Sequence, residues 1–182
     1  MRIKNIDPTT LYITDPVGEV KRIQDLQKAF QTKVTWIEKA FGKAYRSEIQ
    51  DGEYVPEIYY GNDEYIEVLP DDEVTGMCFF DVQDEITVTA NNTFDANINI
   101  VFFVNLKKAF PLLLHRADTE VRQDIINVIK EHQRGWEMNT IITGVENVYS
   151  RYGWTEPEAL IDKQPYHVFS IECNVRYDCY IR

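Results

Sequence analysis

The first long pattern in the chain is that of an amphipathic helix. Apolar residues recur at steps of three and four, which places them on one face of a helix: Ile23, Leu26, Phe30, Val34, Ile37 and Phe41. Asp15 is a suitable N-cap, and Pro16 suits the first helical position because the N–H it lacks is unpaired there anyway. Gly42 follows the last apolar position. The pattern therefore predicts a helix over residues 16–41, with Trp36 off the apolar stripe and at its rim.

Shorter apolar runs, separated by turn residues, then predict strands. Residues 57–60 and 65–69 flank the turn-rich segment 61–64 and predict a β-hairpin with a four-residue connection. Residues 77–82 are a third candidate strand, and residues 91–95 are typical of a turn. Residues 97–106 alternate strictly: one face is wholly apolar and the other is apolar only in its middle, as in a central strand.

A second helix is predicted beyond Pro111. Asp118 or Thr119 can cap it, and Arg134-Gly135 closes it. Its apolar face holds Val121, Ile125, Val128 and Ile129. Residues 138–144 predict a further strand, and residues 150–164, which contain Gly153 and Pro157, predict a long loop.

The last segment, residues 168–181, is the most regular in the chain. Seven apolar side chains from Phe169 to Ile181 occupy every second position, which predicts a half-buried strand. About 14 residues is far longer than the usual ~5–6, so the strand either crosses its whole sheet or projects past it. Projection would leave unpaired backbone groups that another chain could bind. The candidates for such a strand-edge interface are Glu172, Asn174, Arg176 and Asp178.

This order of elements predicts the fold class. Strands dominate, and two main helices are expected to cover one face of a mostly antiparallel β-sheet, which is an α+β architecture. Because 182 residues are about one domain's worth, we predict a single domain over residues 1–182. The acidic segment 51–95 remains open to a second interpretation, as an insertion in that domain. No apolar run is long enough to span a bilayer, and no signal peptide is visible at the start of the sequence.

The charge of the chain is concentrated in its middle third. The net charge is −11, yet the 60 residues between Arg46 and Lys107 hold fourteen acids and no Lys or Arg. Such a block repels phosphate, so we do not expect this segment to bind DNA directly. It is either a solvated acidic surface, or a face that docks a basic subunit or lines a conduit for sliding nucleic acid. The candidate residues are Asp63, Glu64, Asp71, Asp72 and Glu73.

No familiar constellation of reactive residues accompanies these acids. The sequence has no glycine-rich phosphate loop, no nucleophile elbow and no zinc-ligand spacing. The acidic clusters lack the spacing of a calcium loop, and the histidines are isolated: His115, His132 and His167. The cysteines lack CxxC spacing and fit reduced thiols: Cys78, Cys173 and Cys179. We therefore expect no enzyme, and no catalytic residue, metal or cofactor.

The order of elements also invites a comparison. The strand that ends in Asn105-Leu106-Lys107-Lys108, and the closing strand introduced by Gln164-Pro165-Tyr166-His167-Val168-Phe169, are arranged as in the tail-completion proteins of tailed bacteriophages. The chain resembles a tail terminator, or a neck protein of similar build. The resemblance implies a structural virion protein that forms a homo-oligomeric ring, commonly a hexamer, between the tail tube and the head. DNA would pass through the ring without being specifically bound, and the partners would be copies of the chain and neighbouring tail-tube and connector proteins.

A second class of function stays open. An acidic binding module, of the immunity or inhibitor type, would use its carboxylates to neutralise a basic protein. The length and acidity of residues 51–95 depart from the phage pattern and leave this alternative in place. A ring in solution would favour the virion protein, and a monomer that forms a 1:1 complex with a basic protein would favour the module.

Overall fold

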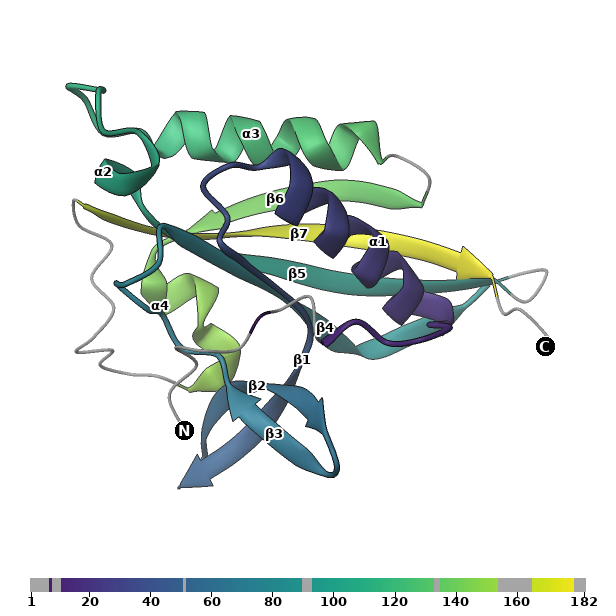
Figure 1. Cartoon of the computed structure of the whole chain (residues 1–182). Coiled ribbons are helices and arrows are strands. Elements are labelled where there is room, and N and C mark those ends of the chain that lie inside the picture. Colours follow the sequence, from purple (N-terminus) through teal and green to yellow (C-terminus); the bar gives the residue numbers. More distant parts are fainter. Residues whose placement is uncertain are drawn as a thin grey trace.

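A computed structural model describes residue 7 and residues 11–50, 52–89, 93–132, 135–153 and 165–178. All seven strands join one sheet, in the order β3-β2-β1-β4-β5-β7-β6 (Figure 1). The strands are β1 Lys39–Gln50, β2 Glu53–Gly61, β3 Glu64–Glu67, β4 Gly76–Val88, β5 Thr93–Asn105, β6 Trp136–Thr143 and β7 Tyr166–Asp178. The helices are α1 Gly18–Lys33, α2 Leu106–Ala109, α3 Asp118–Glu131, α4 Val145–Val148 and the 3₁₀ turn η4 Ser150–Tyr152.

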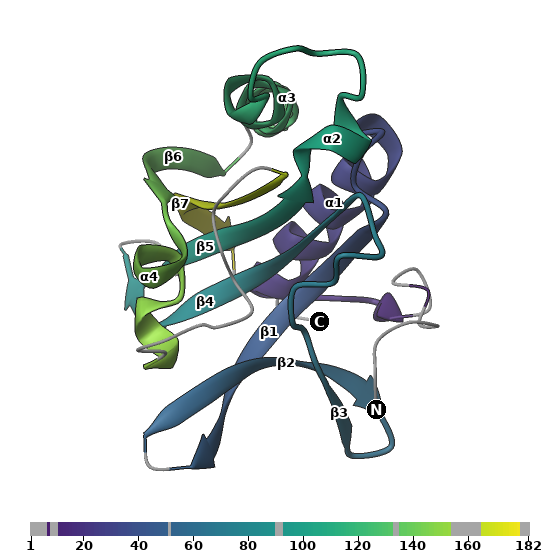
Figure 2. The same ribbon diagram turned by 90° about the vertical axis from the view of Figure 1, so that its left-hand side faces the viewer.

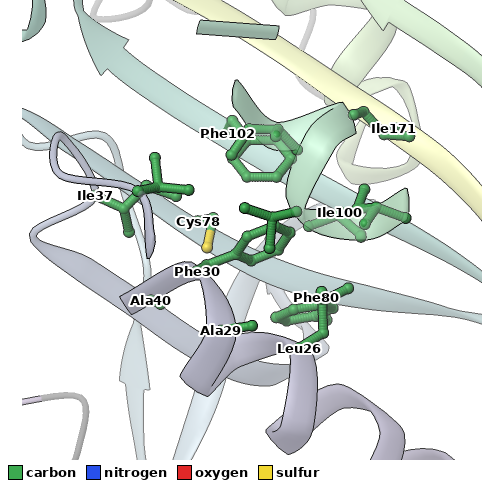
Figure 3. Close-up of a cluster of buried hydrophobic side chains, with 14 of the residues drawn as sticks. Leu26, Ala29, Phe30, Ile37, Ala40, Cys78, Phe80, Ile100, Phe102 and Ile171 are labelled. Atoms are coloured by element: carbon green, nitrogen blue, oxygen red, sulfur yellow. The ribbon is translucent and has the colours of Figure 1, made fainter. Parts of the chain in front are cut away.

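The predicted fold class is confirmed. Every pairing in the sheet is antiparallel except that of β1 with β4, and the two long helices α1 and α3 pack on the same face. Phe30 of α1 lies edge-on against Phe102 of β5, and Phe102 stacks on Phe169 of β7. Figure 3 shows this core from the side of α1, with Leu26, Phe80 and Ile100 around Phe30. The alternation in β5 and β7 therefore serves to present one apolar face to both helices.

The opposite face of the sheet is only partly covered. A second core forms there, where Tyr149 and Tyr152 of the α4–η4 segment lie over Phe79 and Val101. The loop predicted for residues 150–164 thus begins with a 3₁₀ turn, and residues 154–164 lie outside the described residues. Beyond this second core the strands present polar side chains, which are considered below.

A three-stranded wing extends from the body of the sheet. We define the wing as residues 44–67, which comprise the second half of β1 together with β2 and β3; it projects below the helical layer (Figure 2). The predicted hairpin is confirmed, but its turn is tighter than expected. Asn62 and Asp63 both have positive φ, 52° and 61°, as a two-residue type I′ turn requires. The strand β1 was missed, so residues 51–95 belong to the same sheet as the rest of the chain.

The first helix is shorter than predicted at both ends. Asp15 has a φ of 52°, outside the extended region that an N-cap adopts, and the helix is preceded by Val17 instead. It ends at Lys33 because the β-branched and aromatic residues that follow favour extended backbone. Val34 and Ile37 still reach the main core from the turn, whereas Phe41 lies in the second core on the other face. The apolar residues after Lys33 keep the spacing of a helix by chance, although they lie in a turn and in strand β1.

Trp36 also departs from its expected place at the rim. Its side chain is buried, and its indole N–H donates a hydrogen bond to Asp124 Oδ2 at 3.0 Å, which ties the turn after α1 to helix α3. Gly76, at the start of β4, lies directly against it. A Cβ at this glycine would stand 2.7 Å from the indole ring and 2.9 Å from the Trp36 carbonyl oxygen. The close approach of the two segments therefore requires glycine.

The strand β7 crosses the whole sheet and does not form its edge. It pairs with β5 from Tyr166 to Asp178 and with β6 from Phe169 to Val175. Cys173 is buried in the main core as expected, while Cys179 lies outside the described residues. The prediction of a free edge is wrong for Glu172 and Asn174, which lie between β5 and β6, and for Arg176, whose N–H donates to the Gly135 carbonyl oxygen; Asp178 pairs with Thr93 of β5 beyond the end of β6. Within the described chain, the edges of the sheet are β3 and β6.

Candidate functional site

The uncovered part of the sheet carries a polar band, which the strand register defines. Residues that pair across neighbouring strands point to the same face, so each row of partners forms one line across the sheet. The first row is Asp81, Asn99, Glu172 and Thr140, and the second is Asn97, Asn174 and Glu137; the third is Thr87, Asp95 and Arg176. The predicted interface residues Glu172, Asn174 and Arg176 are thus brought together with acids and amides of β4, β5 and β6.

The polar band holds one ion pair and one amide pair between its own strands. The Arg176 guanidinium donates two hydrogen bonds to the Asp95 carboxylate, at 2.8 and 2.9 Å, and holds the pKa of that carboxyl below its usual value. Asn174 Nδ2 donates to Asn97 Oδ1 at 3.2 Å. The outer part of the polar band is therefore a surface on which one ion pair and one amide pair cross from β5 to β7.

The inner end of the polar band holds a buried ion pair. Asp81 is almost fully buried, and its Oδ1 lies 2.8 Å from Arg151 Nη1. Burial raises the pKa of Asp81, and the charge of Arg151 and a hydrogen bond from Tyr152 oppose that rise. Arg151 also reaches the exposed Asp84 at 3.1 Å. The pair fastens the η4 turn to strand β4, so its role is to hold the second core closed.

Two polar atoms near this pair are buried without a hydrogen-bond partner among the described residues. They are Asn99 Oδ1 and Ser170 Oγ. Ser170 sits between Val101 and Ile142 on neighbouring strands, so its hydroxyl faces apolar side chains.

The five acidic candidates fall into two groups. Asp63 and Glu64 are exposed at the β2–β3 turn, at the tip of the wing, whereas Asp71, Asp72 and Glu73 lie in the link from β3 to β4. In the link, Lys39 approaches the Asp71 carboxylate at 3.5 Å, and Lys108 donates to the Asp72 and Glu73 carbonyl oxygens at 2.7 and 2.9 Å. The backbone of the link is thus held against Lys39 and Lys108, whereas Asp63 and Glu64 lie at the end of the wing.

The two edges of the sheet differ in how well they resist pairing with another chain. The edge strand β3 is four residues long with a glutamate at each end, which discourages pairing. The edge strand β6 is eight residues long, contains neither lysine nor proline, and leaves most of its side chains exposed. Of the two edges, β6 presents the longer row of backbone groups, with one glutamate, Glu137, and one irregularity between Met138 and Thr140.

An exposed leucine loop was missed in the sequence. It comprises residues 110–114, between α2 and α3, and extends away from the body of the molecule (Figure 1). Leu112 is 91% exposed and Leu114 is fully exposed, so two large apolar side chains of one loop lie in water. The signal available was the apolar run Phe110-Pro111-Leu112-Leu113-Leu114, which follows a strand and precedes a helix cap. Lys107 and Lys108 precede the leucine loop, and His115 and Arg116 follow it.

A small apolar pocket lies at the base of the wing. It is lined by Leu11, Ile13, Val20, Tyr45, Ile58 and Tyr59 together with polar groups of α1 and β1. Its volume is about 80 Å³. Tyr45 and Tyr59 each place an aromatic ring against Tyr65, so three tyrosines form one exposed cluster at its mouth. We call this site the tyrosine pocket.

The histidines and cysteines occupy structural positions. His115 is paired with Glu120 at 2.7 Å on the surface, and His132 Nδ1 lies 3.0 Å from the Val128 carbonyl oxygen at the end of α3. His167 is buried beside Arg116 and Arg122. Burial raises the pKa of Cys173 to about 12, so this thiol stays protonated. No three His, Cys, Asp or Glu side chains of the described ranges converge as metal ligands would.

Comparison with known proteins assigns no family. No protein-family model matches the sequence, and no curated protein matches it. Within the described residues, no helix is long and apolar enough to span a membrane.

Proposed function

We propose that this chain is a structural virion protein of a tailed phage, which assembles into a homo-oligomeric ring at the junction of tail and neck. The observation that carries the proposal is the edge strand β6, whose outer side no strand of the described chain covers. Tail-tube and connector proteins would be its other neighbours, and DNA would pass through the ring. This function needs no catalytic residue and no cofactor.

A free edge of a β-sheet tends to pair with another chain. An unpaired strand exposes a row of N–H and C=O groups that pair readily with another strand, and proteins that stay monomeric usually protect such edges with charge or proline. The edge at β3 is short and has a glutamate at each end, whereas the edge at β6 is twice as long and carries one glutamate, Glu137, and one irregularity between Met138 and Thr140. A second copy that adds a strand to β6 would extend the seven-stranded sheet across a subunit contact; pairing of β6 with β6 would join only two copies, so a ring requires that the added strand come from a different segment of the next copy.

The acidic tip of the wing suits the interior of such a ring. Asp63 and Glu64 are exposed there, and no lysine or arginine occurs between Arg46 and Lys107. A lumen with this charge would repel the DNA backbone and let it slide. Glu73 and its neighbours, which lie beside α2, would face a protein rather than the lumen.

The experiment is to determine the mass of the purified protein by sedimentation velocity and its shape by negative-stain electron microscopy. We expect a closed ring of several subunits. Ile141→Lys places a charge on the β6 edge, at a side chain that is already 43% exposed, and should shift the ring to monomers without loss of the fold. Val88→Lys, at a 64% exposed position on β4, is the matched control and should leave the ring intact.

The result against this proposal is a wild-type protein that stays monomeric at all concentrations. That result would favour the acidic binding module. One observation supports this alternative: tyrosines and acids lie together on one face of the wing. On that face Tyr45 is in register with Glu57, and Glu57 is in register with Glu67. Aromatic and acidic side chains together suit a basic protein partner. Capture of such a partner as a 1:1 complex by the monomer would establish that alternative.

A further inference from the structure

We propose that one face of the wing binds an arginine side chain of a partner protein. We call it the outer wing face, and it comprises Tyr45, Glu57, Tyr59, Tyr65 and Glu67. In the proposed assembly the arginine would belong to a neighbouring tail-tube or connector protein, so the inference rests on the proposed function for the identity of that partner. The chemistry of the site rests on the wing alone.

The strand register brings these five side chains together. Glu57 of β2 is in register with Tyr45 of β1 on one side and with Glu67 of β3 on the other. Tyr59 of β2 is in register with Tyr65 of β3. Because residues two apart on a strand point to the same face, the row that holds Glu57 adjoins the row that holds Tyr59. Three aromatic rings and two carboxylates therefore share one side of the three-stranded wing.

The three rings touch one another and remain exposed. Tyr65 lies edge-on to its neighbours, with its ring centroid 5.8 Å from that of Tyr45 and 5.3 Å from that of Tyr59. Tyr45, Tyr59 and Tyr65 are 42%, 43% and 48% exposed. The alternate residues Ile58 and Ile66 are buried in the second core, so the other side of these strands packs on the body of the molecule. The rings thus form an aromatic patch that the described part of the chain leaves uncovered.

The two carboxylates give this face a negative charge that the chain does not neutralise. Neither Glu57 nor Glu67 forms an ion pair with a lysine or arginine among the described residues, and Glu57 accepts a hydrogen bond from the Ser47 hydroxyl. Lys43 borders the face, but its ammonium nitrogen lies 3.2 Å from a carboxylate oxygen of Glu19, which meets its charge. A face of exposed rings and unpaired carboxylates is complementary to a cation.

The chemistry of the face favours arginine over lysine. The wing already holds one arginine on a tyrosine ring: on its other side, the guanidinium carbon of Arg46 lies 4.6 Å from the ring centroid of Tyr54. A planar guanidinium can stack on a ring and donate two parallel N–H groups to a carboxylate, whereas an ammonium is a compact, strongly hydrated charge. Since rings and carboxylates alternate on the outer wing face, a guanidinium can use both.

The test is isothermal titration calorimetry of the full chain with two short peptides. Glycine alternates with arginine in the first peptide and with lysine in the second, and both have the same length and charge. We expect the arginine peptide to bind the wild type, and the lysine peptide to bind with a Kd at least about threefold higher, because it lacks the stacking plane and the paired donors.

A first pair of variants tests the rings. Tyr59→Ser/Tyr65→Ser removes two rings from the outer wing face and should raise the Kd for the arginine peptide about tenfold. Tyr60→Ser is the matched control: this tyrosine is 47% exposed, but it alternates with Tyr59 and lies on the other side of the strand. It should leave the Kd unchanged. Circular dichroism of each variant verifies that the fold is retained.

A second pair of variants tests the carboxylates. Glu57→Gln/Glu67→Gln removes two charges from the outer wing face and should raise the Kd for the arginine peptide about fivefold. Glu48→Gln/Glu64→Gln removes the same charge from exposed alternate positions of β1 and β3 and should change the Kd by less than about twofold. The comparison separates binding at this face from attraction to the net charge of the chain.

Failure of this inference differs from failure of the ring. If rings form but the arginine peptide does not bind, or binds Tyr59→Ser/Tyr65→Ser with an unchanged Kd, the ring stands and the outer wing face is not an arginine site. Equal Kd values for the two peptides would also overturn the inference, since they would show attraction to acidic charge alone. A monomeric wild type that binds the arginine peptide as expected would refute the ring and leave this site standing.

Discussion

The buried ion pair between Asp81 and Arg151 makes a quantitative prediction. Arg151→Ala would leave the Asp81 carboxylate, whose side chain is 7% exposed, without its counter-charge. Removing one partner of a buried pair costs about 3–5 kcal/mol, because the remaining charge is left desolvated. Since the Arg151 side chain is 19% exposed and water can replace part of it, we expect the free energy of unfolding to fall by about 2–3 kcal/mol at pH 7.

The pH dependence has a definite sign. Burial already raises the pKa of Asp81, and loss of Arg151 removes the main opposing charge, so the pKa rises further in the variant. A carboxyl whose pKa is higher in the folded state binds a proton there first, so stability falls as the pH rises from the unfolded value, near 4, through the folded value. The destabilisation of Arg151→Ala should therefore shrink as the pH is lowered toward 4.

The assay is urea denaturation followed by circular dichroism at pH 7 and at pH 4.5. Asp84→Asn, which breaks only the exposed contact of Arg151, is the control and should change stability by less than about 0.5 kcal/mol. Asp81→Asn in the Arg151→Ala background should recover most of the loss, since a neutral amide needs no counter-charge. The reasoning is refuted if Arg151→Ala costs the same at both pH values, or if Asp81→Asn brings no recovery.

Two further substitutions test the backbone geometry of the fold. Gly76→Ala would place a Cβ 2.7 Å from the Trp36 ring and 2.9 Å from its carbonyl oxygen. We therefore expect the free energy of unfolding, measured by urea denaturation, to fall by about 2–3 kcal/mol. A decrease below about 0.5 kcal/mol would mean that the turn after α1 moves to make room. Asp63→Gly relieves a φ of 61° at the wing turn and should stabilise the protein by about 0.5–1 kcal/mol, measured in the same way, while a decrease would argue against the type I′ turn.

Local patterns predicted those elements in which the apolar residues keep one spacing from end to end. The alternation in β5 and β7 and the apolar stripe of α3 were confirmed because each has one face against the same core. The prediction failed where apolar residues keep the same spacing although the chain passes from a helix into a strand. Phe41 continues the stripe of α1 at helical spacing, yet it lies on β1 and on the other side of the sheet. Spacing alone does not distinguish these cases.

The candidate surface residues were likewise predicted in part from the sequence and in part only seen in the structure. Glu172, Asn174 and Arg176 were rightly placed on one face of the last strand, but whether that strand is an edge depends on residues 136–143, which pair with it from elsewhere in the sequence. The two groups of acids appeared as one block, and only folding separates the tip of the wing from the link beside α2.

The sequence by itself determined the α+β class, the two amphipathic helices, the existence of the hairpin and the acidic middle third. These follow from interactions between residues close in sequence, such as side-chain periodicity and turn preference. Only the tertiary structure decided that β7 is interior and β6 an edge, that Asp81 is buried against Arg151, and that the leucine loop and the tyrosine pocket lie at opposite ends. Strand order and burial depend on contacts between distant segments, and no local pattern of residues encodes which strand will be the neighbour of another.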